Sequence, residues 1–237
     1  MTTLLYLEDC WKLEDTAQVI ALSNWEGKTA VILDKTIFYP QGGGQPFDQG
    51  TIKGTNAIFE VTEVRKKDDL VCHIGTFSRG TFSARDKVTL HVNKERRLLN
   101  SKIHTAGHLI DTALTNKGIH LQPTKGYHFP EGPSLEYKGT MQTDETTRAR
   151  VEQEINRLVK EGFEIKIEFI DQSEIEARCK YLPEYLPQCK CRIVTVAGTI
   201  ACPCGGTHVR NINELGKVVI SKIKVKGETT KISYNIQ

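Results

Sequence analysis

The chain has 237 residues, of which 26% are charged and 38% hydrophobic, and its formal net charge is +3. This composition is typical of a globular protein, and because no apolar run approaches the length of a bilayer crossing, a protein that spans membranes with helices is excluded. The small positive charge permits contact with nucleic acid, although dedicated nucleic-acid binders are usually more basic.

The N-terminus and the cysteines indicate a compartment. The first residues contain no basic region of the kind that opens a secretory signal, and acidic residues occur early. An odd number of cysteines without such a signal favours reduced thiols. We therefore expect a cytoplasmic enzyme with no membrane contact, while its oligomeric state, monomer or weak dimer, stays open.

Short β-branched or aromatic runs separated by turn-forming residues predict a strand-rich N-terminal part. The expected strands cover residues 29–33, 35–39, 58–64, 70–74 and 87–92, with a turn at Asp34. Many short strands with regular turns are typical of a small barrel. The sequence thus predicts a β-rich domain over residues 1–91 that contains a run of three glycines.

From Asn93 the hydrophobic period changes to that of a helix. Apolar residues recur at spacings of four and three, at Leu99, Ile103, Ala106, Ile110 and Ala113. Asn93 can cap this helix, which should end near Asn116 or Gly118.

The rest of the chain alternates between the two patterns. We expect a hairpin over residues 126–137, a helix capped by Thr143 and stopped by Gly162, and a short helix over residues 173–180. Further strands are expected over residues 164–170, 192–196, 218–225 and 231–236. This order predicts an α+β domain over residues 92–237, with helices packed on one face of a mostly antiparallel sheet.

Two five-residue motifs carry a metal-ligand residue at each end: HTAGH (residues 104–108) and CGGTH (residues 204–208). Positions i and i+4 of a helix share a face, so His104 and His108 can present two imidazoles to one ion. Cys204 and His208 would complete a tetrahedral set of three nitrogens and one sulfur, which zinc accepts. Thr105 stands where a zincin protease needs glutamate, so that class is excluded.

Four cysteines leave a second zinc site open. Cys189 and Cys191 form one C-x-C pair, and Cys202 and Cys204 form another. One-residue spacers are less usual in zinc sites than longer ones, so the mixed His/Cys set is favoured. Cys202, beside Cys204, is a candidate oxidation partner if the metal is lost.

The two zinc motifs and the upstream run FYPQGGGQ (residues 38–45) together resemble the alanyl-tRNA editing family. That family comprises the free-standing AlaX proteins and the editing domain of alanyl-tRNA synthetase. The similarity runs over nearly the whole chain, and in length and motif content it is that of the medium-sized type, AlaX-M. The zinc pairs alone are shared with the editing domain of bacterial threonyl-tRNA synthetase, whereas the ordered trio of motifs is specific.

This resemblance implies a hydrolase with one Zn²⁺ per chain that cleaves the ester joining serine, or in some cases glycine, to alanine tRNA. A synthetase pocket for alanine cannot strongly reject serine, which only adds a hydroxyl, so an editing step must supply the discrimination. Four protein ligands would close the coordination shell, which is typical of a structural zinc site. Zinc could still bind the ester by expanding its coordination or by exchanging one ligand, so we expect it to position the ester and to act as a Lewis acid.

The resemblance also suggests residues that meet the substrate. Thr105 and Gln122 are the candidate catalytic residues and the candidate contacts for a serine hydroxyl. The plainer interpretation is that Thr105 bonds back to a helix carbonyl and that Gln122 is an ordinary loop residue.

Candidate contacts with tRNA are Gly43, Gly44, Gln45, Arg96 and Lys125. The glycine run is neither a P-loop nor a dinucleotide fingerprint, and its plainer interpretation is a turn that needs positive φ. Arg97 and Lys102 share a helix with the zinc histidines and could also reach the acceptor stem.

Other charged and aromatic positions receive structural interpretations. Lys222, Lys224 and Lys226 alternate along one strand, which is typical of a solvated or edge face, with a stripe of phosphate contacts as the alternative. His128 lies in an aromatic run and is expected to be structural.

Three functions of different classes follow. The chain is a deacylase of mischarged alanine tRNA, an editing enzyme for another tRNA such as threonine tRNA, or a zinc-stabilised RNA-binding module without activity.

Overall fold

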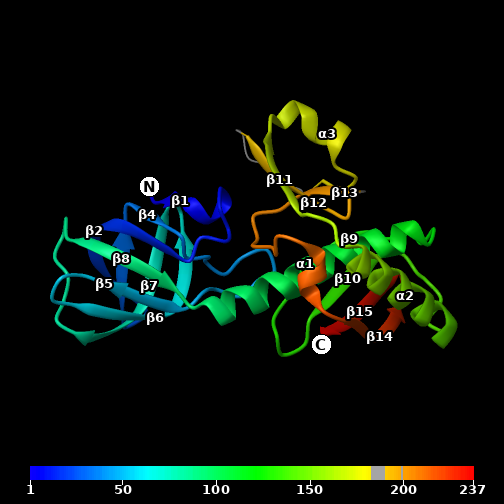
Figure 1. The fold of residues 1–237 in the computed structure, drawn as a ribbon, viewed down its shortest axis with the longest axis horizontal. Helices are drawn as coiled ribbons and strands as arrows, with labels where there is room; N and C mark the ends of the chain where they lie inside the picture. The colour runs from blue at the N-terminus through cyan, green and yellow to red at the C-terminus, as the bar shows by residue number, and fades with distance from the viewer. Residues whose placement is uncertain (183–189, 199) are drawn as a thin grey trace. The chain divides into compact units, whose positions relative to one another are not determined.

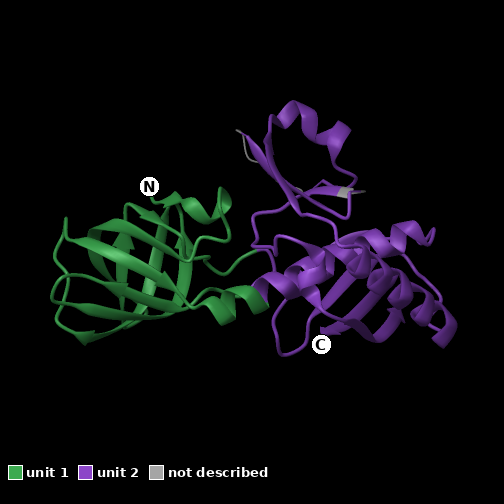
Figure 2. Cartoon of the chain, viewed as in Figure 1, with its two compact units in different colours: residues 1–42, 46–99 green, residues 43–45, 100–237 purple. Residues whose placement is uncertain are grey.

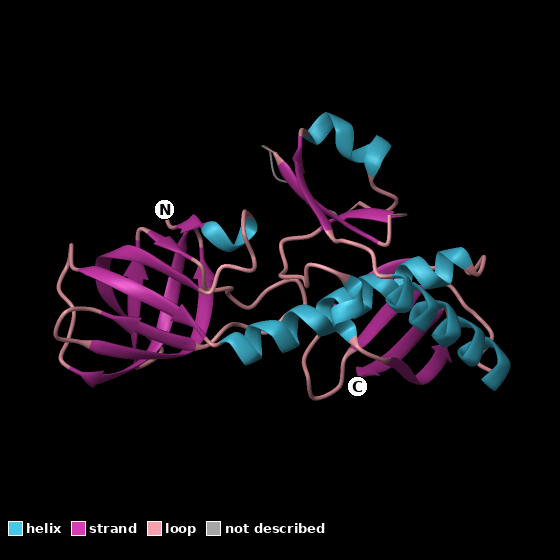
Figure 3. Cartoon of the chain, viewed as in Figure 1, coloured by secondary structure: helices cyan, strands magenta, loops and turns pink. Residues whose placement is uncertain are grey.

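The computed structural model describes residues 1–182, 190–198 and 200–237. The chain divides into two compact units (Figure 2): unit 1 comprises residues 1–42 and 46–99, and unit 2 comprises residues 43–45 and 100–237. The sequence-based boundary at 91/92 precedes the first long helix, whereas the units divide within that helix. A closed barrel, further sheets and helices (Figure 3) confirm the predicted α+β class.

Unit 1 is built around a closed antiparallel barrel with the strand order β2–β3–β7–β6–β5–β8 (Figure 1). Its strands are β2 (Glu14–Trp25), β3 (Lys28–Leu33), β5 (Gly50–Lys53), β6 (Ile58–Lys67), β7 (Leu70–Arg79) and β8 (Lys87–Val92). Inward-facing residues such as Val31, Leu33, Phe59 and Leu90 are fully buried in its core. The small barrel predicted from the short strands is confirmed, although the sequence pattern predicts no strand at the positions of β2 and β5.

The predicted strand over residues 35–39 is mostly absent. Only β4 (Lys35–Thr36) pairs, in parallel with β1 (Thr3–Leu4), which precedes the short 3-10 helix η1 (Leu5–Leu7). Beyond β4 the backbone bonds to side chains: the Phe38 N–H donates to Thr36 Oγ1 at 3.0 Å, and the Tyr39 N–H donates to Asp48 Oδ2 at 2.7 Å. Side-chain acceptors thus replace a strand partner here.

A buried ion pair fixes the start of helix α1 (Lys94–Asn116) within unit 1. As predicted, Asn93 caps the helix, and its side chain accepts from the Arg96 N–H at 3.0 Å. Arg97 is only 3% exposed; its guanidinium binds the Asp48 carboxylate and donates to two backbone carbonyls at 2.6 Å. The expectation that Arg97 reaches an acceptor stem is therefore wrong. Breaking a buried ion pair such as Arg97–Asp48 typically costs about 3–5 kcal/mol.

Unit 2 contains an antiparallel sheet of strand order β14–β15–β10–β9, and helices α1 and α2 pack on one of its faces (Figure 1). Its strands are β9 (Gln122–Tyr127), β10 (Ser134–Lys138), β14 (Val218–Lys226) and β15 (Thr229–Ile236). The inward side chains Tyr137 and Tyr234 share one core with Leu109 of α1 and Ile155 of α2. β9 and β10 form the hairpin that the sequence predicts.

Helix α2 (Glu145–Glu161) starts one residue later than predicted. Asp144, rather than Thr143, is the N-cap, and its carboxylate accepts from the Thr147 N–H at 2.9 Å. A carboxylate here also interacts favourably with the positive end of the helix dipole. Gly162, with φ of 71°, ends the helix as predicted.

A second antiparallel sheet follows, made of β11 (Lys166–Ile170), β12 (Cys191–Val196) and β13 (Ile200–Pro203). Two short helices, η2 (Gln172–Glu174) and α3 (Ile175–Arg178), accompany it, whereas the 3-10 helix η3 (Ile212–Leu215) packs in the core that α2 shares with the first sheet. Phe169 of β11 is 43% exposed, whereas Ile170 packs against Ile175 and Ile193. In the described part of the chain, no helix is both long and apolar enough to span a membrane.

His73 lies inside the barrel and is bonded at both ring nitrogens. Its Nδ1 is 3.0 Å from the Val31 carbonyl oxygen, and its Nε2 is 2.7 Å from Thr36 Oγ1. Nδ1–H therefore donates to Val31, and Nε2 accepts from the threonine hydroxyl. Burial lowers the pKa of His73 to about 4, because the charged ring would lose its hydration.

We expect His73→Gln to change how stability depends on pH. As pH falls from the unfolded pKa of 6.5 towards 4, the unfolded chain binds a proton that the folded barrel excludes, so wild-type stability falls. The variant has no histidine at this position, so its stability does not fall in this way. The difference in free energy of unfolding between wild type and variant, measured by chemical denaturation, should therefore shrink by on the order of 2 kcal/mol between about pH 7.5 and about pH 5.

His120→Gln, at an exposed position, is the control for removing a histidine. A destabilisation by His73→Gln that is equal at both pH values would contradict the lowered pKa.

Candidate metal centre

Four side chains of types that ligate metals converge in unit 2: His104, His108, Cys204 and His208. Their ligand atoms all lie within 4.8 Å of one another. The first two share a face of α1, one turn apart, and the last two lie in the segment after β13. The structure thus brings together the two pairs that the sequence predicts as one ligand set.

The spacing of these donors suits a tetrahedral ion. Cys204 Sγ is 3.6 Å from His104 Nε2 and 3.4 Å from His208 Nε2. A tetrahedral zinc ion, with bonds of about 2.3 Å to sulfur and about 2.05 Å to nitrogen, would separate such atoms by about 3.6 Å. Cys204 Sγ also accepts from the Gly206 N–H at 3.3 Å, which favours the thiolate. The donor set and its spacing therefore fit Zn²⁺.

Gln45 orients the ring of His104. The glutamine is fully buried, and its Oε1 lies 2.7 Å from His104 Nδ1 and 2.9 Å from the Thr207 backbone nitrogen. Because an amide oxygen only accepts, His104 Nδ1 carries the proton and Nε2 is left for a metal. Gln45 Nε2 donates to Thr207 Oγ1 at 2.9 Å, and that hydroxyl pairs with Ser101 Oγ at 2.7 Å. This network fixes the amide itself.

The other two imidazoles are oriented in the same way. His208 Nδ1 lies 3.1 Å from Thr105 Oγ1, and His108 Nδ1 lies 3.1 Å from Cys202 Sγ. The Cys202 thiol is directed to the Val194 carbonyl at 3.9 Å, so its sulfur can accept from His108. With all three Nδ1 atoms protonated, every Nε2 lone pair is available to one ion.

Burial keeps the three histidines uncharged at pH 7. It lowers the pKa of His104 and His208 well below the ordinary value, and neighbouring histidines lower both further. Burial, with a smaller contribution from Arg192, lowers the pKa of His108 to about 4. Neutral imidazole is the form that binds a metal, so no proton has to be displaced from these rings at neutral pH.

His128 is part of the centre, although its aromatic neighbours in the sequence predict a structural strand residue. Its ring stacks on His104 with centroids 4.4 Å apart and planes inclined by 22°. Its Nδ1 donates to the Tyr234 hydroxyl at 2.7 Å, and that hydroxyl donates to the Ile103 carbonyl at 3.0 Å. Burial lowers the pKa of His128 to about 3. Because no second ligand stands at a regular spacing from it, the sequence gives no signal of this position.

Two motif glycines make room for these rings. A Cβ on Gly107 would lie 2.6 Å from His128 Cε1, and a Cβ on Gly206 would lie 2.1 Å from His104 Cε1. Both distances are too short for a real side chain, so each position requires glycine. The inner residues of HTAGH and CGGTH are thus as important to the geometry as the ligands at their ends.

The glycine-rich run also contributes to unit 2. Gly43 and Gly44 have φ of 53° and 78°, as the turn interpretation predicts. The Gly44 carbonyl accepts from the His128 N–H at 2.8 Å. Gln45, a predicted tRNA contact, is committed to His104 and is fully buried.

The remaining predicted site residues lie outside the cluster. Gln122 is exposed at the start of β9, six residues before His128, which is about 20 Å of extended chain. Lys125 is exposed on the same strand. Arg96, in unit 1, donates from Nε to the Phe47 carbonyl at 2.9 Å.

The described residues do not form the alternative all-cysteine site. Cys191 is buried with Cys179 in a separate small core, and Cys202 contacts His108. Cys189 lies outside the described residues. Among the residues described, the mixed His/Cys set is the cluster whose spacing could hold a metal.

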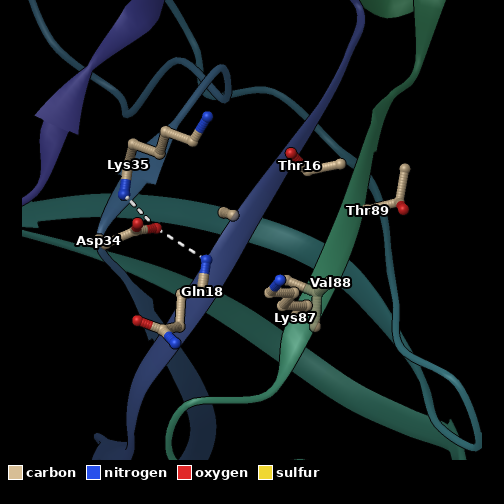
Figure 4. A pocket seen from close by; sticks show the side chains of 8 residues that line it. Thr16, Gln18, Asp34, Lys35, Lys87, Val88 and Thr89 are labelled. Atoms are coloured by element: carbon tan, nitrogen blue, oxygen red, sulfur yellow. Dashed lines mark hydrogen bonds between the residues drawn. The ribbon is translucent and has the colours of Figure 1, made fainter.

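A pocket of about 430 Å³ in unit 1 (Figure 4) offers no comparable chemistry. Asp34, on its wall, accepts from the backbone N–H groups of Gln18 and Lys35, both at 2.8 Å. Its carboxylate therefore holds the predicted turn, and Figure 4 shows both bonds. The candidate functional site is thus the centre in unit 2.

Two family models match the chain. Residues 8–96 match the family described as tRNA synthetases class II (A). Residues 191–231 match the threonyl and alanyl tRNA synthetase second additional domain, and this match contains Cys204 and His208. Both parts of the chain are thus similar to parts of tRNA synthetases.

Individual relatives are similar over most of the chain. It is 32% identical to the alanyl-tRNA editing protein AlaX-M of Saccharolobus solfataricus, covering 99% of this chain and 98% of that protein. It is 30% identical to AlaX-L of Pyrococcus horikoshii, covering 96% of this chain and 56% of that protein. It is 28% identical to the alanine–tRNA ligase of Methanobrevibacter smithii, covering 99% of this chain and 27% of the ligase. The chain thus spans about half of AlaX-L and about a quarter of the ligase, but nearly all of AlaX-M.

We expect Gln45→Met to lower the affinity for Zn²⁺ about 10- to 100-fold, because His104 would lose the acceptor that fixes its ring. Gln45→Glu keeps an acceptor at this position and should bind Zn²⁺ nearly as tightly as wild type. Competition with a chromophoric chelator measures both affinities.

Thermal unfolding of each variant shows whether the fold is retained. Equal Zn²⁺ affinities for the methionine and glutamate variants would mean that Gln45 does not orient His104.

Proposed function

The chain belongs to the AlaX family of alanyl-tRNA editing proteins, and on this premise we propose that it hydrolyses the aminoacyl ester of alanine tRNA charged with serine or glycine. The observation that carries this proposal is the convergence of His104, His108, Cys204 and His208 in a chain similar over its whole length to AlaX-M. A charged tRNA is therefore the proposed partner, and the cytoplasm the proposed location.

The proposed cofactor is Zn²⁺, one per chain, held by the three Nε2 atoms and the Cys204 thiolate. When bound there, it supplies a Lewis acid that can polarise an ester carbonyl, although a thiolate ligand weakens its acidity. The protein's own part is to hold the rings rigidly: Gln45, Thr105 and Cys202 each engage one Nδ1. A site held in this way can place an ester repeatedly in one geometry.

Thr105 is the proposed contact for the serine hydroxyl. Its Oγ1 accepts from the Val209 N–H at 3.3 Å and from His208 Nδ1, so both lone pairs are used and its hydroxyl hydrogen remains as a donor. A serine oxygen could accept that hydrogen, whereas alanine offers no such oxygen. The exposed position of Gln122, near the far end of β9, favours Thr105 over Gln122 for this contact.

Contact with tRNA is proposed at Gly43, Gly44, Arg96 and Lys125. Lys125 is exposed and Arg96 is half-buried, so both can offer positive charge to phosphates. Gln45 acts instead through His104, since its amide is already bonded.

The direct test is deacylation of Ser-tRNA(Ala), Gly-tRNA(Ala) and Ala-tRNA(Ala) by the zinc-loaded protein. We expect rapid loss of serine or glycine while alanine is spared. His104→Ala should reduce the rate at least about 100-fold, since it removes a ligand rather than a supporting contact. His120→Ala, at an exposed position, is the matched control.

Each other outcome selects a different function. Hydrolysis of mischarged threonine tRNA alone would favour an editing enzyme for that tRNA. Tight tRNA binding with stoichiometric zinc and no ester cleavage would favour an RNA-binding module. Full activity of His104→Ala would show that the reaction does not use this centre.

A further inference from the structure

The sheet β14–β15–β10–β9 has one face under the helices and one face exposed (Figure 1). The strand register aligns the side chains of this second face in rows across it. One row runs Lys125–Glu136–Lys231–Lys224, and the next runs Gln122–Lys138–Thr229–Lys226. A third runs Tyr127–Ser134–Ser233–Lys222. Each row ends in a lysine of β14, one of the two edge strands.

This exposed face is strongly and asymmetrically charged. Six exposed lysines lie on it, here called the lysine face: Lys125, Lys138, Lys222, Lys224, Lys226 and Lys231. Glu136, paired with Lys231 at 3.2 Å, is the acidic residue in these rows. The face therefore has a net charge of +5, while the whole chain has +3, so the remainder carries −2. Lysines on an edge strand prevent it from pairing with a strand of another chain, but this need does not account for so uneven a distribution of charge over a whole face.

An aromatic pair adjoins the lysine face on the side of the metal centre. Tyr127, in the third row, is 42% exposed and stacks on Phe129 with centroids 4.6 Å apart and planes inclined by 16°. His128, between them in sequence, points the other way and stacks on His104. The short segment 127–129 thus joins the exposed face of the sheet to the centre where the ester would react.

We infer that the lysine face binds the phosphate backbone of the tRNA acceptor end, and that Tyr127, backed by Phe129, stacks a base near its 3′ terminus. This inference rests on the proposed deacylation at the metal centre. Lysines neutralise phosphates without regard to sequence, and unpaired bases stack on exposed aromatic rings. An anionic membrane would match the charge but not a stacked ring pair beside a buried metal centre.

The test compares two charge-matched pairs of substitutions in the full-length, zinc-loaded protein. Lys222→Gln/Lys224→Gln removes two charges from the lysine face, and Lys160→Gln/Lys166→Gln removes two exposed charges elsewhere in unit 2. Binding of uncharged tRNA(Ala) is measured by fluorescence anisotropy over a series of salt concentrations, so the readout does not depend on catalysis. The first pair should weaken binding roughly tenfold and reduce the slope of log K against log salt by about two, while the control pair leaves both nearly unchanged.

A second measurement isolates the stacking platform. A seryl ester of adenosine has a base but no phosphate, so its hydrolysis should be unchanged in Lys222→Gln/Lys224→Gln. Tyr127→Leu keeps an apolar side chain but removes the ring, and it should raise KM for this ester about five- to a hundredfold with little change in kcat. Equal thermal unfolding midpoints would confirm that each variant is folded.

Several results would overturn the inference. These are wild-type tRNA binding by the lysine-face variant, equal loss in both lysine pairs, or an unchanged KM in Tyr127→Leu. Loss of binding to phosphatidylserine vesicles in the lysine-face variant, with tRNA binding intact, would assign the face to membranes instead. If neither the wild type nor any variant cleaves an ester, but tRNA binding still depends on the lysine face, the proposed deacylase function is wrong. The inference that the lysine face binds tRNA would still hold.

Discussion

The centre in unit 2 depends on one constraint: each of three imidazoles must turn the same nitrogen inward. A neutral ring donates from one nitrogen and accepts at the other, so a fixed acceptor at Nδ1 decides what Nε2 can do. Three different acceptors meet this need, the amide of Gln45, the hydroxyl of Thr105 and the sulfur of Cys202. Each buried ring would otherwise lose its hydration without a compensating partner. The ligand set is thus determined as much by the surrounding acceptors as by the ligands.

The fold supplies those acceptors from remote parts of the chain. Gln45 bonds to Thr207, 162 residues away, although the residues on either side of segment 43–45 cluster with unit 1. Thr105 lies inside the HTAGH motif but serves His208 of the other motif. Each motif therefore positions part of the other, and the glycines at 107 and 206 allow the rings to come close enough.

The sequence predicted local features well because they depend on neighbouring residues. The cap at Asn93, the stop at Gly162 and the two spaced ligand pairs are all determined within a few positions. It failed where long-range pairing decides the outcome. β2, a long strand of mixed polarity, is held in place by its pairing with β3 and β8. His128 reaches the centre because the hairpin of β9 and β10 brings its ring against His104 of α1. No local pattern records either arrangement.

The same distinction applies to charge. A net charge of +3 is lower than that of most dedicated nucleic-acid-binding proteins, so the total charge alone does not indicate a binding surface. Yet a phosphate backbone responds to charges within about 10 Å of it at moderate salt, because more distant ones are screened. Strand register, which no composition reveals, gathers the six lysines on one face and leaves the rest of the chain slightly negative. A weakly basic chain can therefore present a strongly basic surface on one face of a sheet.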